Sequence, residues 1–185
     1  MRASALALAL IAGPALGADP FPMPPGTPFA LHTGAGVPRT EVDPAGNHQI
    51  LYFGYANCPD MCLTTLPHIA AVVEALAAIG IAVTPLMITV DPGHDQGPAM
   101  DATLAAHHPA FVGLTGPEAA LRPIWQAFGI TFEEMFLDPY GQPILAHTGH
   151  LFLLGPQGNL ETLLPPVLPV EATARIIARY AGVAG

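Results

Sequence analysis

The pattern of apolar and polar positions predicts strands that alternate with helices. Two runs, His48–Tyr55 and Ile81–Val90, are almost continuously apolar, as expected of strands buried on both faces of a sheet. Between them, apolar residues recur at the spacing of one helix face: Leu66, Ile69, Val72, Val73, Leu76 and Ile79. Pro67 is tolerated in the first turn of a helix, where its missing N–H has no partner to lose, so this helix is predicted to start near Thr64 or Thr65.

The remaining patterns extend this alternation. Short strands are predicted at Phe29–Thr33, Pro38–Val42 and Phe111–Leu114, helices at Pro98–His107, Pro117–Phe128 and Val170–Tyr180, and a hairpin from Leu151–Leu154 and Asn159–Leu164. Trp125 and Phe128 are expected to point inward. This order predicts an α/β fold, in which helices cover a mixed central sheet.

The length of 185 residues favours a single domain with a full core. At the N-terminus, Arg2, a short apolar run at 5–12 and small residues up to Ala18 are typical of a secretory signal peptide. An uncleaved N-terminal anchor is the alternative. The segment 19–28 is proline-rich and indicates a linker. The predicted organisation is therefore a signal peptide at 1–18, a linker at 19–28 and a folded domain at 29–185, exported or periplasmic and soluble after cleavage.

The charge balance argues against nucleic-acid binding. The chain has fourteen acidic residues against five basic ones, all arginine, and a net charge of -9 with histidine neutral. Binding to phosphates requires a basic face, which this composition does not offer. The same balance suits a protein that meets a basic partner.

The only two cysteines, Cys58 and Cys62, lie four residues apart directly after the strand predicted at 48–55. In a helix-like turn their Cα atoms would be about 6 Å apart, within the usual disulfide span of roughly 4.4–6.8 Å. The N-terminus of the following helix stabilises thiolates, which favour soft ions such as Cu(I) and Zn(II). A structural zinc site needs four ligands, and no second cysteine or histidine pair accompanies this one. Soft-metal binding and thiol redox chemistry both stay open, and a structural disulfide is the plainer alternative.

A metal held by two cysteines needs a further ligand. The candidates are the histidines, at positions 32, 48, 68, 94, 107, 108, 147 and 150. Most lie in helix or strand-edge contexts typical of surface or packing residues. His147 and His150 differ, because they precede the predicted hairpin, and in a thioredoxin-like layout that segment returns across the redox centre.

Three segments resemble the Sco/SenC family, in family order. The run Tyr52–Cys62 (YFGYANCPDMC) is similar to the family's cysteine segment. Thr89-Val90-Asp91-Pro92 with Asp95 is similar to its T-x-D-P-x-x-D segment. His147-Thr148, followed by Pro156-Gln157-Gly158, is similar to the segment with the family's histidine ligand. Together they cover roughly 29–180.

This resemblance implies a thioredoxin-like fold and a copper site, for Cu(I) or Cu(II), formed by Cys58, Cys62 and His147. It implies a metallochaperone that helps to build the binuclear copper centre of cytochrome c oxidase. The expected partners are the copper-centre subunit and, in addition, another periplasmic copper chaperone or a thioredoxin-like reductant. The alternative is a thiol-disulfide oxidoreductase, in which Cys58 and Cys62 reduce the cysteines of that copper centre. A peroxiredoxin-like peroxidase is disfavoured, since no arginine lies near Cys58 in the sequence.

The chain departs from the family pattern at two places. Ala146 stands where the family often has aspartate before the histidine, so a carboxylate that orients His147 is missing or comes from elsewhere. Leu63 stands where proline often follows the second cysteine. His150 is an extra ligand candidate, which its position in the pattern disfavours relative to His147. Asp91 and Asp95 are expected either to hold the loop above the site or to form a plain turn.

Overall fold

The structure is a computed structural model that describes residues 27–56 and 62–182. Over this part of the chain the elements follow in the order β1 Ala30–His32, β2 Pro38–Thr40, β3 His48–Gly54, α1 Cys62–Ala77, β4 Val83–Thr89, α2 Gly97–His107, β5 Val112–Leu114, α3 Glu118–Ala127, β6 Phe132–Leu137, β7 Pro143–His147, β8 Leu151–Leu154, β9 Leu160–Leu164 and α4 Val170–Tyr180. The predicted signal peptide, most of the predicted linker and Cys58 lie outside the described residues. No helix within the two described ranges is long and apolar enough to cross a membrane.

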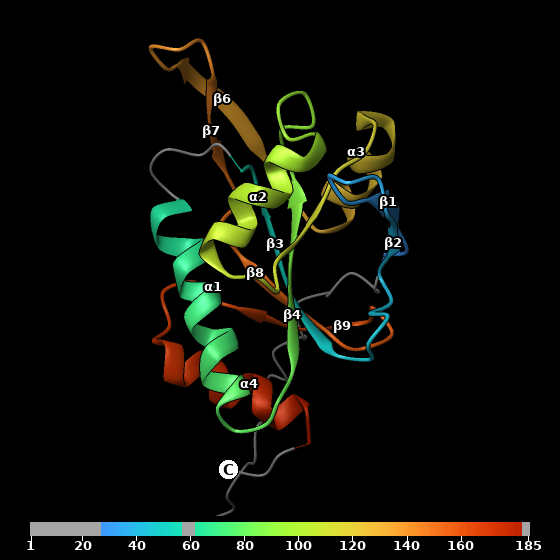
Figure 1. Cartoon of the computed structure of the whole chain (residues 1–185), viewed down its shortest axis with the longest axis vertical. Coiled ribbons are helices and arrows are strands. Elements are labelled where there is room, and N and C mark those ends of the chain that lie inside the picture. The colour runs from blue at the N-terminus through green and yellow to red at the C-terminus, as the bar shows by residue number, and fades with distance from the viewer. Residues whose placement is uncertain (1–26, 57–61, 183–185) are drawn as a thin grey trace, which may run out of the picture.

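A five-stranded sheet with the order β5-β4-β3-β8-β9 forms the centre of the molecule (Figure 1). Strand β3 runs parallel to β4, which in turn runs parallel to β5. On its other edge β3 pairs antiparallel with β8, and β8 with β9. The mixed sheet with flanking helices confirms the α/β fold that the sequence predicts.

Both faces of this sheet are buried, which explains why β3 and β4 read as continuous apolar runs. Ile50 and Tyr52 point into a core shared with α1, α2 and α4. Leu51, Phe53 and Tyr55 point into a second core, shared with α3 and β1. Figure 1 shows the corresponding layers, with α1, α2 and α4 on one side of the sheet and α3, β1 and β2 on the other. The predicted inward orientation of Trp125 and Phe128 is confirmed, since both are buried in the second core.

The first helix differs from its prediction at both ends. It begins at Cys62 rather than near Thr64 or Thr65, so Pro67 lies in its second turn. A proline there costs one backbone hydrogen bond, a loss that the packing of the helix offsets. Ile79, expected on the apolar face, lies beyond the helix end and is 58% exposed.

The segment between α3 and β8 forms a hairpin that the sequence analysis did not predict. Strands β6 and β7 pair antiparallel as a separate two-stranded sheet, which projects from the body of the molecule (Figure 1). The Asp138 carboxylate closes the turn by accepting hydrogen bonds from the backbone N–H groups of Tyr140 and Gln142, both at 2.8 Å. All six residues of β6 are exposed. We refer to residues 132–147 as the arm.

The packing of β4 leads to a stability prediction. Leu86 is fully buried in the second core, so Leu86→Ala removes apolar contacts and leaves a cavity. We expect its free energy of unfolding, measured by urea denaturation, to fall by about 2–5 kcal/mol. The control is Val37→Ala, at a position that is 58% exposed, with an expected change within about 0.5 kcal/mol. Equal losses in the two variants would contradict the assignment of Leu86 to the core.

Candidate metal centre

The candidate site lies at the carboxyl end of β3, the edge of an α/β sheet where ligands commonly bind. From β3 the described chain continues through Tyr55 to Ala56, and it resumes at Cys62, the first residue of α1. The second segment of the site arrives through β8, whose first residue, Leu151, lies opposite Tyr52. This pairing brings His147, the last residue of β7, back to the end of β3.

Two tyrosines hold the His147 ring. Tyr52 and Tyr55 contact the imidazole edge-on, with ring centroids 5.7 and 5.9 Å away. Both tyrosines are buried, at 0% and 2% exposure, so they cannot easily move aside. His147 itself is half-buried. Its ring therefore has a fixed orientation and retains access to solvent.

The hydrogen bonds of His147 assign its two nitrogens. Nδ1 lies 3.2 Å from the backbone carbonyl oxygen of Thr148. A carbonyl oxygen only accepts hydrogen bonds, so in the neutral ring the proton is on Nδ1 and the lone pair is on Nε2. The hydroxyl of Tyr52 lies 3.4 Å from Nε2, a long contact. A histidine that donates one N–H to a carbonyl and keeps its other nitrogen basic has the usual arrangement of a metal ligand.

This arrangement also bears on the missing aspartate. Ala146 cannot orient the imidazole, and the carbonyl of Thr148 occupies that role at Nδ1 instead. Sequence reasoning does not reveal such a partner, because every residue has a backbone carbonyl.

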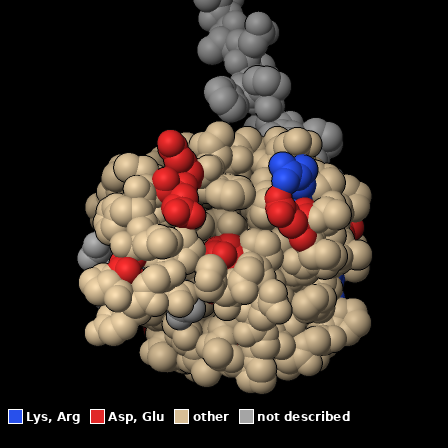
Figure 2. Space-filling view, turned by 90° about the horizontal axis from the view of Figure 1, so that it is seen from above, with Lys and Arg blue, Asp and Glu red and all other residues tan. Residues whose placement is uncertain are grey.

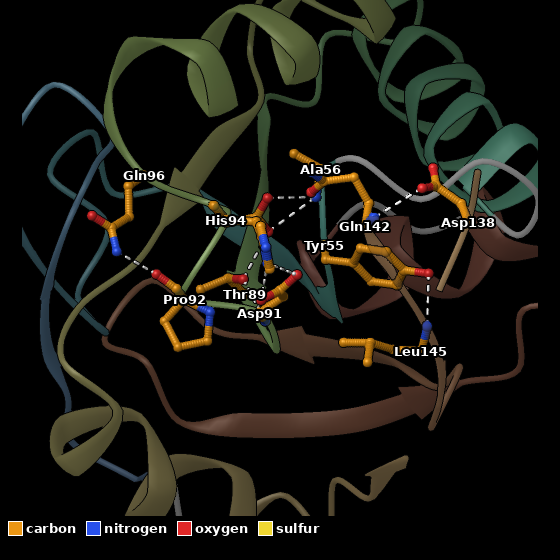
Figure 3. Close-up of polar contacts among 11 residues, drawn as sticks. Tyr55, Ala56, Thr89, Asp91, Pro92, His94, Gln96, Asp138, Gln142 and Leu145 are labelled. Atoms are coloured by element: carbon orange, nitrogen blue, oxygen red, sulfur yellow. Dashed lines mark hydrogen bonds and ion pairs between the residues drawn. The ribbon is translucent and has the colours of Figure 1, made fainter. Parts of the chain in front are cut away.

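The backbone on both sides of His147 is tied down. The Leu145 N–H donates to the Tyr55 hydroxyl at 3.1 Å, which links β7 to the end of β3 (Figure 3). On the other side, the Thr148 N–H donates to the Thr131 carbonyl at 3.0 Å, and the Thr131 N–H donates to Thr148 Oγ1 at 3.1 Å. His147 is thus positioned by strand β3 and by the base of the arm together.

Asp95 anchors the exit of β3. Its carboxylate is almost fully buried and accepts a hydrogen bond from the Ala56 N–H, 3.0 Å from each oxygen, and one from Thr89 Oγ1 at 2.7 Å. Ala56 is the last described residue before the cysteines. Of the two interpretations of Asp95, these contacts favour the one in which it holds the loop. Asp91 is paired instead with His94, at 2.9 Å, within the same turn (Figure 3).

Burial determines the protonation of Asp95. Desolvation raises the pKa of its carboxyl to about 6, although the hydrogen bonds from Thr89 and Ala56 act in the opposite direction. The neighbouring charge of Asp91 raises the pKa further.

Gly54, between the two tyrosines of the site, has no room for a side chain. A Cβ atom at this position would lie 2.4 Å from Cε1 of Tyr52. Because Tyr52 is fully buried and its ring contacts His147, a larger residue at position 54 would displace one of the groups that orient the imidazole.

Of the three predicted ligands, the structure places His147. Cys58 lies outside the described residues, and Cys62 is described only as the first residue of α1. His150, the extra candidate, is exposed. Within the described ranges, no group of three or more His, Cys, Asp or Glu side chains could hold a metal ion.

Other histidines have carboxylate partners away from this site. His48 contacts Glu161 at 3.2 Å, and His108 contacts Glu74 at 2.8 Å. These contacts agree with the expectation that they are surface or packing residues.

Sequence reasoning did not single out Tyr52 and Tyr55 as parts of the site. Their signal was present: two aromatic residues with polar tips stand at the end of a buried strand, immediately before the cysteines. Tyr and Trp hydroxyl and N–H groups usually find a partner when they are buried. Two such tyrosines therefore indicate that a polar partner lies beside this end of the strand.

Comparison with known proteins identifies the family to which the chain is similar. The sequence profile of the family described as SCO1/SenC matches residues 18–182. The human protein SCO1 homolog, mitochondrial, is 32% identical over 136 residues, which are 72% of this chain and 45% of the human protein. Protein SCO1, mitochondrial, from Saccharomyces cerevisiae is 32% identical over 141 residues, 75% of this chain and 48% of the yeast protein. The chain thus spans about half the length of these curated relatives.

Solved structures of Sco proteins have the same fold. Yeast Sco1 with copper bound superposes with a TM-score of 0.76 at 26% identity, covering 86% of this chain and 90% of the yeast chain. Bradyrhizobium japonicum ScoI with copper bound gives a TM-score of 0.73 at 26% identity, covering 84% and 98%. The predicted thioredoxin-like fold is confirmed.

The burial of Asp95 predicts a specific pH dependence of stability. Its pKa is raised from the ordinary value of 3.8 to about 6 in the folded protein. Between these values the folded state binds more protons than the unfolded state, so the contribution of Asp95 is fully present below pH 3.8 and is lost as the pH rises through 6. Relative to Asp95→Asn, we expect the wild type to lose roughly 3 kcal/mol of unfolding free energy between pH 4 and 7. Parallel pH profiles of the two proteins in urea denaturation would contradict the raised pKa.

The contact between Gly54 and Tyr52 predicts the effect of a single methyl group. Gly54→Ala overpacks a buried position, and we expect a loss of about 1–3 kcal/mol in unfolding free energy. We also expect the NMR signals of the His147 ring to shift, because the Tyr52 ring moves. Gly149→Ala is the control, since a Cβ there would meet no atom within 4 Å. An unshifted His147 spectrum in Gly54→Ala would show that Tyr52 does not orient the imidazole.

Proposed function

The chain belongs to the SCO1/SenC family, and we propose that it binds copper through Cys58, Cys62 and His147 and takes part in assembling the binuclear copper centre of cytochrome c oxidase. Yeast Sco1 and Bradyrhizobium japonicum ScoI, which share the fold, have been solved with copper bound. A further structural neighbour, BsSco, is described as a member of the Sco family of cytochrome c oxidase assembly proteins. In this proposal copper is a cargo that the chain holds and then passes on.

The observation that carries the proposal is the state of His147. Its Nδ1 faces the Thr148 carbonyl, which leaves the lone pair on Nε2. The ring lies beside the carboxyl end of β3, the strand that leads to the cysteines. Two thiolates and one imidazole form a donor set that suits both Cu(I) and Cu(II). Three protein ligands also leave a position through which a partner's donor atom can enter. The residues present therefore fit copper.

The proposal includes export. The apolar N-terminal run and the small residues up to Ala18 support a signal peptide at 1–18, a linker at 19–28 and a periplasmic domain at 29–185. In such an oxidising compartment a close cysteine pair forms a disulfide unless a reductant or a metal prevents it. A thioredoxin-like reductant is accordingly part of the proposal, together with the copper-centre subunit of the oxidase as the acceptor.

The second candidate is a thiol-disulfide oxidoreductase that acts on the cysteines of the oxidase copper centre. The four-residue spacing of Cys58 and Cys62 favours it, since the same two thiols can close a disulfide. This function makes no use of the lone pair on His147 Nε2. The need for His147 therefore separates the two candidates.

Copper titration of the reduced protein tests the leading proposal. We expect one copper per chain, and a weaker and shifted thiolate-to-Cu(II) absorption in Cys58→Ser and in Cys62→Ser, each of which keeps one thiolate. His147→Ala should weaken Cu(II) binding by at least about 100-fold, because even the loss of a group that orients a ligand costs 10- to 100-fold. His150→Ala is the matched control, three residues further along and exposed, and should bind copper as the wild type does.

Two outcomes would count against this proposal. Unchanged copper affinity and absorption in His147→Ala would show that His147 is not a ligand. If His150→Ala weakened copper binding as much as His147→Ala does, the assignment of His147 rather than His150 would be wrong. The reductase is tested separately, by mixing the metal-free dithiol protein with an oxidised copper-centre peptide. Rapid electron transfer that is the same in wild type and His147→Ala would favour the reductase.

A further inference from the structure

The arm carries a concentration of exposed apolar side chains. Phe132, Met135, Phe136, Leu137 and Tyr140 are exposed by 40, 58, 60, 58 and 89%. They make up half of the ten large apolar residues that are exposed within the described ranges. Exposed apolar side chains concentrated in one element mark interaction sites in folded proteins.

The fold of the arm depends on Phe132 but not on the exposed apolar residues further out. The turn is closed by Asp138, and the base is held by the Thr131–Thr148 hydrogen bonds. Phe132 packs against Trp125 of α3, with ring centroids 4.8 Å apart, and so anchors the root of β6. The apolar residues further out, from Met135 to Tyr140, belong to neither of the two hydrophobic cores.

A β-bulge shapes the outer part of the arm. The register with β7 shifts between Glu134 and Phe136, so Met135 is the extra residue. A bulge re-aims side chains and bends the strand, and both effects discourage a further strand from pairing with this edge. The arm is therefore suited to contact a partner through its side chains rather than through strand addition.

The charge of the arm indicates the chemistry of that partner. Between Gly129 and Gly149 the sequence contains Glu133, Glu134 and Asp138 but no lysine or arginine. Figure 2, which looks onto the end of the molecule from which the arm projects, shows a mostly uncharged surface with several separate acidic side chains and one basic group beside an acidic one. An acidic surface with apolar side chains is complementary to an apolar surface surrounded by lysine and arginine.

The arm is continuous with the candidate metal centre. Its second strand ends at His147, and an open hollow at its base is lined by Thr131, Phe132, Glu133, Ala146, His147 and Thr148. A protein seated on the arm would lie against the same edge of the sheet as the imidazole.

We infer that the arm is the docking surface for the protein that accepts copper from this chain, a partner whose surface is apolar and surrounded by basic residues. The inference rests on the proposed function. Exchange requires no change in the oxidation state of copper. Each donor atom of the partner that binds the ion replaces one of this chain, and a partner thiol releases a proton as a cysteine thiolate of this chain takes one up. Docking on the arm holds the two sets of ligands together during this exchange.

Copper transfer to a purified, metal-free copper-centre domain of cytochrome c oxidase tests the inference. With the full chain loaded with copper, we expect Met135→Ser combined with Phe136→Ser to lower the second-order transfer rate by about tenfold or more. Glu134→Lys should lower it several-fold at low salt, and this difference should shrink at high salt, where the charges are screened. Copper stoichiometry and affinity of the arm variants should match the wild type.

Ile79→Ser is the matched control, because Ile79 is as exposed as Met135, at 58%, but lies at the end of α1. Equal transfer rates for this control and the double arm variant would overturn the inference. So would a wild-type dimer that the double variant converts to monomers without slowing transfer, since the arm would then be an interface between copies of this chain.

Failure of the proposed function has a different signature. If the wild type binds no copper, calorimetry of the metal-free chain with the same oxidase domain still measures docking. Binding that is lost in the double arm variant and kept in Ile79→Ser would support the arm as a docking surface. Binding that is absent, or equal in both variants, would overturn it.

Discussion

The central strand β3 is buried on both faces and paired on both edges, and the rest of the structure is arranged around it. Its alternate side chains belong to two separate cores, so helices are required on both sides of the sheet. Its parallel edge receives β4 and its antiparallel edge receives β8. These two pairings bring Thr89 and the Asp95 turn to one side of its carboxyl end, and His147 to the other. A single strand thereby assembles a site from three distant parts of the chain.

Next to the site, the protein buries a carboxyl group that would be more stable in solvent. Asp95 is a carboxyl buried against its preference for solvent, and burial raises its pKa despite the hydrogen bonds to Ala56 and Thr89. Removing a charge from water is costly even when hydrogen bonds compensate for part of the loss. The buried carboxylate fixes the backbone at Ala56, where the chain leaves β3 two residues before Cys58.

The sequence predicted the parts of the fold that depend on burial. The continuous apolar runs of β3 and β4 and the helical spacing in α1 reflect contact with a core, so their patterns reveal them. The arm was missed because β6 is exposed along its whole length and its bulge breaks the alternation of side chains. The turn from Asp138 to Gly141 was a usable signal, since aspartate, proline and glycine together favour a tight turn.

The site was predictable only in its chemically distinctive residues. Position and resemblance select Cys58, Cys62 and His147 as ligand candidates from two cysteines and eight histidines, and of the three the structure places only the His147 side chain. The groups that orient His147 are a backbone carbonyl and two aromatic rings, and these depend on the pairing of β3 with β8 rather than on any local pattern.

The arm shares no strand pairing with the five-stranded sheet. Substitutions in its outer part, from Met135 to Tyr140, therefore leave the layers around β3 intact, whereas substitutions at Tyr52, Gly54 or Tyr55 reach the imidazole directly. The outer part of the arm and the rings that orient His147 can thus be changed independently by mutation. Evolution or engineering can alter the first over many residues while the second, tied to the most buried strand, stays the same.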